Sequence, residues 1–102
     1  MKVFTQSINF NADQKLINYI EKKVGNLEKF HDKIVDVEVF LKVQKTSEKE
    51  NKVTEVKINI PGNELMVKKQ CKTFEEGVSI SVESLKRQLR KSKEKSRTIL
   101  AL

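Results

Sequence analysis

Residues 35–44 read VDVEVFLKVQ, and this stretch decides how the rest of the chain can be assigned. Its aliphatic side chains recur at every second position from Val35 through Val39 to Val43. A period of two is typical of a β-strand that buries one face, because successive side chains point to opposite sides. We therefore predict a strand here and assign the neighbouring segments outward from it.

Two more extended segments follow this strand. The polar stretch 46–52 (TSEKENK) indicates a hairpin loop, and alternation resumes with Val56, Ile58 and Ile60. The turn signal at 61–63 (PGN) then leads into 64–71, whose lysines suit a strand with one solvent-exposed face.

Two amphipathic helices are also indicated. Asn11 and Gln14 form a capping-box pattern, so we expect the first helix to begin at Asn11. Its apolar stripe comprises Leu16, Ile20, Val24 and Leu27. Thr73 and Glu76 form a second capping box before a long final helix, whose stripe comprises Phe74, Val78, Val82, Leu85 and Leu89. Beyond Leu89 the stripe reaches serines, so the helix should leave the core there.

With an extended run over 2–10, the order is β-α-β-β-β-α, which belongs to the α+β class. We predict a four-stranded, mostly antiparallel sheet with two helices packed on one face, similar to a double-stranded-RNA-binding domain. The first two strands can pair in parallel, since a helix separates them. At 102 residues one domain is expected, over 1–95, with a short tail at 96–102.

The net charge of +7 is concentrated near the C-terminus. From Ser81 onward there are seven basic and two acidic residues, so this last part carries 7 − 2 = +5. A polyanionic partner is indicated, with nucleic acid as the first candidate. A membrane surface is disfavoured, because Leu89 is the one bulky apolar residue between Lys86 and Arg97.

Helical spacing arranges the cations into ridges. One ridge on the last helix comprises Lys86, Arg90, Lys93 and Arg97, flanked by Arg87 and Lys91. On the first helix, Lys15, Lys22 and Lys29 lie opposite the core stripe. We expect phosphate contact rather than base reading, because the basic residues lack a companion set of Asn, Gln and aromatic side chains. Four phenylalanines are assigned to the core (Phe4, Phe10, Phe30 and Phe74); Tyr19 and Phe40 could stack at the surface, although a core position is favoured for both.

Catalytic chemistry is poorly supported, and we predict neither an enzyme nor any cofactor or metal. His31 is expected to cap a helix end, and Cys71, without a CxxC partner, to be a small buried hydrophobe. The unpaired cysteine and the polar, short N-terminal stretch indicate a cytoplasmic protein without a signal peptide.

Two stretches carry a resemblance to a known family. Residues 85–93 (LKRQLRKSK) and 23–30 (KVGNLEKF) resemble motifs of the short hibernation-promoting factors, also called ribosome-associated inhibitors. The chain departs from the family pattern over 73–79. It also departs at Asn26 and Ser84, two positions at which the family frequently has a basic residue.

The resemblance implies a protein that occupies the decoding channel of the small ribosomal subunit and contacts its rRNA. Messenger and transfer RNA would then be blocked at the A and P sites, and translation inhibited in resting cells. The RNA-binding residues implied are Lys23, Lys29, Lys86, Arg87, Arg90, Lys91 and Lys93, whereas helical phase favours Lys22 over Lys23. Another hibernation factor is a further candidate partner; a membrane or a small-molecule substrate is not expected. Two alternatives stay open: a general double-stranded RNA-binding module, and a protein-interaction module that uses the exposed sheet face or the apolar tail.

Overall fold

The alternating stretch forms the second strand of a four-stranded sheet in the computed structural model. The structure describes residues 1–45, 47 and 49–101, with side chains described as far as Lys91. The elements are β1 (Lys2–Ile8), α1 (Gln14–Gly25), the 3-10 helix η1 (Asn26–Phe30), β2 (Asp36–Val43), β3 (Lys52–Ile60), β4 (Asn63–Cys71) and α2 (Phe74–Ala101).

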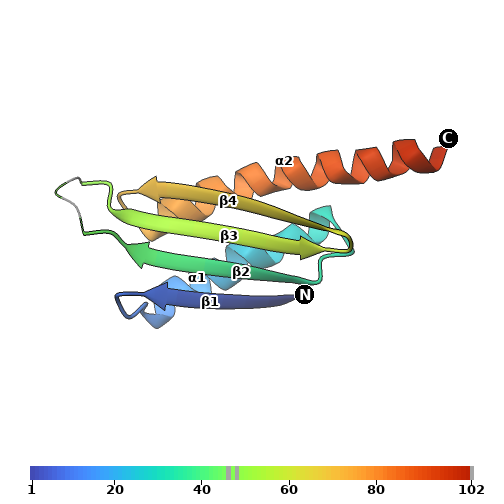
Figure 1. Cartoon of the computed structure of the whole chain (residues 1–102). Helices are drawn as coiled ribbons and strands as arrows, with labels where there is room; N and C mark the ends of the chain where they lie inside the picture. Colours follow the sequence, from blue (N-terminus) through green and yellow to red (C-terminus); the bar gives the residue numbers. More distant parts are fainter. Residues whose placement is uncertain (46, 48, 102) are drawn as a thin grey trace.

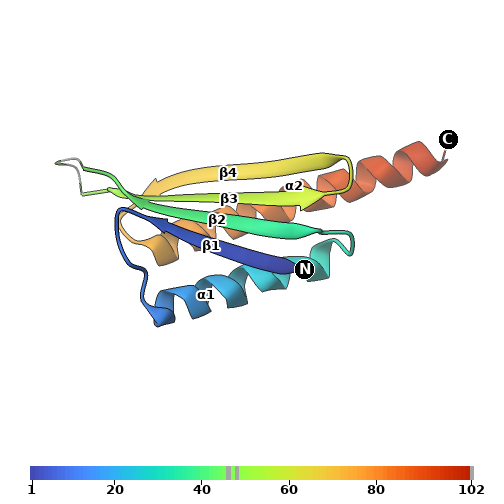
Figure 2. The ribbon, with the colours of Figure 1, turned by 60° about the horizontal axis from the view of Figure 1, so that its bottom comes forward.

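The strands lie in the order β1-β2-β3-β4. β1 and β2 pair in parallel, and the other two pairs are antiparallel. Both helices cover the same face of the sheet, and the other face is open (Figures 1 and 2). The predicted α+β fold, with its β-α-β-β-β-α order, is confirmed. α2 runs alongside the strands and continues past their ends (Figure 1).

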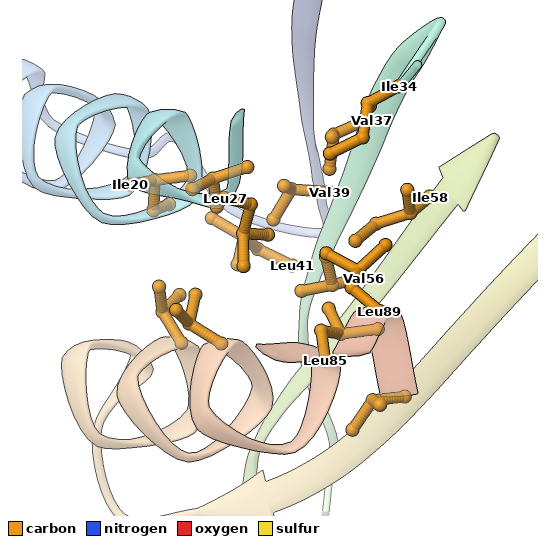
Figure 3. Close-up of a cluster of buried hydrophobic side chains, with 14 of the residues drawn as sticks. Ile20, Leu27, Ile34, Val37, Val39, Leu41, Val56, Ile58, Leu85 and Leu89 are labelled. Atoms are coloured by element: carbon orange, nitrogen blue, oxygen red, sulfur yellow. The ribbon is translucent and has the colours of Figure 1, made fainter. Parts of the chain in front are cut away.

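The core lies between the sheet and the helical layer (Figure 3). Val39 and Leu41 of β2 and Val56 of β3 are completely buried, as are Leu85 and Leu89 of α2. Burial of such side chains stabilises the fold by about 1.5–3 kcal/mol each. Because Leu85 and Leu89 fix the inner side of α2, the four described cations beside them must face outward or sideways: Lys86, Arg87, Arg90 and Lys91.

The start of α1 differs from the expectation. Asp13, not Asn11, caps the helix, because its carboxylate accepts a hydrogen bond from the Leu16 amide at 2.8 Å. The second capping prediction is confirmed at its N-cap: the Thr73 hydroxyl accepts from the Glu76 amide at 3.2 Å.

The start of β2 also differs. Val35 was assigned to the buried face, but it is 58% exposed and the strand begins at Asp36. Ile34 enters the core in its place and is 8% exposed. Within the described residues, no helix is both long and apolar enough to cross a bilayer.

Candidate nucleic-acid interface

The predicted basic residues of α2 divide into two groups around the helix. Arg87 and Lys91 are exposed and lie on the side of α2 that is turned away from the sheet. Lys86 and Arg90 lie on the flank that faces η1, where Lys86 is half-buried. The side chains of Lys93 and Arg97, the remaining members of the predicted ridge, lie outside the described residues.

Phe30, at the end of η1, lies against that flank of α2. The Lys86 ammonium lies 5.2 Å from the centroid of the Phe30 ring, and the Arg90 guanidinium lies 5.1 Å from it. Both distances fall within the range of cation–π attraction. The Lys86 ammonium also forms an ion pair with Glu83, one turn earlier, at 3.1 Å. Two of the predicted RNA-binding cations are therefore gathered over one aromatic ring.

Tyr19 and Lys23 repeat this arrangement on α1. The Lys23 ammonium lies 5.7 Å from the centroid of the Tyr19 ring. The Tyr19 hydroxyl in turn donates a hydrogen bond of 3.3 Å to the Glu75 carbonyl, in the first turn of α2. Lys23 consequently borders the junction between the two helices, whereas Lys15, Lys22 and Lys29 are exposed on the outer surface of α1 and η1.

These contacts refine one expectation about the aromatic residues and correct another. Phe30, which is expected in the core, is half-buried: it packs against the core cluster and also lies beneath two cations. The cations thus do have aromatic companions. The sequence carries part of this signal: at about 100° per residue, Tyr19, Lys23 and Phe30 fall within roughly 40° of one another, beside the core stripe. It does not place the cations of α2 over Phe30.

The other phenylalanines take different positions. Phe10 and Phe74 stack with centroids 4.8 Å apart, which joins the segment before α1 to the start of α2. Phe4 is 53% exposed, so its assignment to the core was wrong. β1 directs it to the open face of the sheet, where its neighbour Phe40 is half-buried.

His31 and Cys71 have local structural contacts. The His31 Nδ1 accepts a hydrogen bond of 3.1 Å from the Lys33 amide, just after η1. Cys71 is buried at the end of β4, and this burial raises the pKa of its thiol. Among the described residues, no group of three or more His, Cys, Asp and Glu side chains is placed to hold a metal ion.

Comparison with known proteins places the chain in a family. The model of the family described as Sigma 54 modulation protein / S30EA ribosomal protein matches residues 3–97. The chain belongs to this family. The relationship that the motifs at 23–30 and 85–93 indicated is thereby confirmed, and both motifs lie within the matched range.

Individual members of the family agree with this assignment. The ribosome hibernation promoting factor of Pseudomonas putida is 30% identical over 100 residues, which cover 98% of this chain and 94% of that protein. The ribosome hibernation promotion factor of Deinococcus radiodurans is 30% identical over 87 residues, covering 83% of this chain and 45% of that protein. A ribosomal subunit interface protein from Coxiella burnetii has the same fold, with a TM-score of 0.80 at 18% identity, over 92% of this chain and 99% of that one.

Proposed function

We propose that this protein is a ribosome hibernation factor that binds the rRNA of the small subunit in the decoding channel. Bound there, it blocks messenger and transfer RNA at the A and P sites and inhibits translation in resting cells. It acts by occupancy, so it needs no catalytic group and no cofactor. Its partners are the small ribosomal subunit and, in some states, another hibernation factor.

The observation that carries this proposal is the one-sided basic surface of the helical layer. Lys23, Lys86 and Arg90 gather at the junction of the helices, Arg87 and Lys91 continue the surface along α2, and Lys22 and Lys29 extend it on the first helical segment. Lysine and arginine side chains presented in this way neutralise RNA phosphates. The names of the relatives, which refer to ribosome hibernation, support rRNA as the source of those phosphates.

The shape of the molecule also suits a channel. Its principal extents are 53 × 25 × 18 Å, and the long direction follows α2 (Figure 1). A slender body with its cations along one side can contact a succession of phosphates while it fills the space between RNA walls. The likeness to a ribosomal subunit interface protein supports the fold that this mode of binding requires.

Sedimentation of purified small subunits with the protein tests the binding. We expect cosedimentation that weakens steeply with salt, because counterions are released from RNA on binding. A variant with Lys86, Arg87, Arg90 and Lys91 changed to Ala should remain folded but bind more than about 100-fold more weakly, since each of the four lost phosphate contacts contributes roughly 1 kcal/mol.

Two further measurements test the mechanism. Saturating protein should inhibit a cell-free translation extract, and transfer RNA bound beforehand at the P site should prevent the protein from binding. Normal translation at saturation would contradict the proposal. Equal affinity for an arbitrary RNA duplex would instead favour a general double-stranded RNA-binding module.

A further inference from the structure

We propose that Phe30 is a positioning residue of this RNA-binding surface, and that its ring holds Lys86 and Arg90 ready for two phosphates. The inference rests on the proposed function and adds to it a residue that carries no charge. Its basis is the pair of cation-to-ring distances, 5.2 Å for Lys86 and 5.1 Å for Arg90.

The burial of Phe30 separates this role from that of an ordinary core residue. Leu27, three positions earlier in η1, is completely buried in the core, whereas Phe30 packs against the core cluster with only part of its surface. Phe30 keeps part of its surface exposed and has two cationic groups close to its ring. By contrast, Phe74 is 6% exposed and stacks on another phenylalanine.

The ring acts across two elements of the fold. Phe30 belongs to η1, whereas both cations belong to α2 and lie one turn apart on the same flank. The ring therefore fixes the two long side chains relative to the first helical segment before RNA arrives. Since lysine and arginine otherwise lose much rotamer freedom on binding, this preorganisation should increase affinity.

The variant Phe30→Leu removes the ring and keeps an apolar side chain in its place. We expect its affinity for purified small subunits to fall roughly fivefold, with the dependence on salt unchanged because the same phosphates are contacted. Phe30→Tyr, which keeps the ring face, should bind like the unmodified protein. Phe40→Leu is the matched control, because Phe40 is also half-buried but lies on the open face of the sheet.

A double-mutant cycle distinguishes positioning from direct contact with RNA. If the ring acts through the two cations, Phe30→Leu should have no further effect on affinity in a protein that already carries Lys86→Ala and Arg90→Ala. The same fivefold loss in that background would overturn the inference, since the ring would then act on RNA or on the fold. So would an unchanged affinity of Phe30→Leu in the otherwise unmodified protein.

These outcomes distinguish a failure of the positioning role from a failure of the proposed function. If Phe30→Leu binds normally while Lys86→Ala and Arg90→Ala weaken binding, only the positioning role fails. If the unmodified protein does not bind small subunits at all, the proposed function fails. Thermal unfolding monitors the fold of each variant, and Phe30→Met replaces Phe30→Leu should the latter be unfolded.

Discussion

The open face of the sheet and the outer surface of the helical layer are both rich in lysine, yet they arrange it differently. On the open face, cross-strand register brings opposite charges together. Lys57 lies 3.5 Å from the carboxylate of Glu38 and 3.4 Å from that of Glu64, and these two acids raise the pKa of Lys57, with Glu64 as the larger cause. The neighbouring Asn59 amide donates to the carboxylates of Asp36 and Glu38.

This balance extends over the whole open face. The register of the strands places four lysines there, together with four carboxylates: Lys2, Lys42, Lys57 and Lys68, with Asp36, Glu38, Glu55 and Glu64. On the helical layer, the Lys86–Glu83 pair is the one ion pair of an α1 or α2 cation within the described residues. The number of cations therefore does not distinguish the two surfaces: the open face carries as many carboxylates as lysines, whereas the stretch 84–91 of α2 carries four cations and no carboxylate.

Removing equal charge from each surface tests this difference most directly. Changing Arg87, Arg90 and Lys91 to Ala, or Lys2, Lys42 and Lys68 to Ala, lowers the net charge by three, from +7 to 7 − 3 = +4. We expect the helical variant to bind small subunits about 100-fold more weakly, at roughly 1 kcal/mol for each lost phosphate contact. The open-face variant should stay within about twofold of the unmodified protein, because a distant charge acts only through screened, long-range attraction.

Sedimentation or fluorescence anisotropy over a range of salt concentrations measures both affinities. The salt dependence should also separate the two, because only the helical variant gives up phosphate contacts. Equal losses of affinity in the two variants would show that net charge alone governs binding, and would contradict the distinction between the two surfaces.

A pair of glycine substitutions tests how closely α2 packs on the covered face of the sheet. A Cβ added at Gly77 of α2 would lie 2.6 Å from the Oγ1 of Thr54, a buried side chain of β3. Gly77→Ala should therefore destabilise the fold by about 1–3 kcal/mol, the usual cost of overpacking. Gly25→Ala is the control, because nothing lies within 4 Å of a Cβ there and the backbone is helical; it should stabilise by about 0.4–1 kcal/mol.

Chemical denaturation measures both changes, and a second substitution identifies the cause. Thr54→Ala removes the hydroxyl that a Cβ at position 77 would strike, so the double variant should be more stable than the two single effects predict together. If Gly77→Ala left the stability unchanged, α2 would not approach β3 so closely.

The sequence predicted the elements of the fold well, because each has a strong local period. The alternation over 35–44 and the apolar stripes of the two helices identify strands and helices without reference to their neighbours. The ends of elements were less predictable. Asp13 and Asn11 are both good capping residues, and Ile34 and Val35 are both aliphatic, so only the packed chain decides which one caps the helix or enters the core.

Local patterns likewise predicted only part of the candidate site. The charge pattern and the family motifs already indicated Lys86, Arg90 and Lys23. The partnership of Phe30 with two of these cations could not be derived from either helix alone, because it joins η1 to α2 across more than fifty residues. An aromatic residue in an apolar pattern is assigned to the core unless the neighbouring element is known.

Glu83 offers a test with a smaller expected effect, because it forms the one ion pair with an α1 or α2 cation within the described residues. Its carboxylate pairs with Lys86 at 3.1 Å, and an RNA phosphate that approaches Lys86 must compete with it. Glu83→Gln should therefore tighten binding to small subunits by about twofold, since an exposed ion pair contributes roughly 0.2–1 kcal/mol. Glu55→Gln makes the same change of charge on the open face, opposite Lys68, and should leave the affinity unchanged. If both substitutions tighten binding equally, the gain comes from net charge; if only Glu83→Gln does, the carboxylate restrains the one cation of this surface that is already paired.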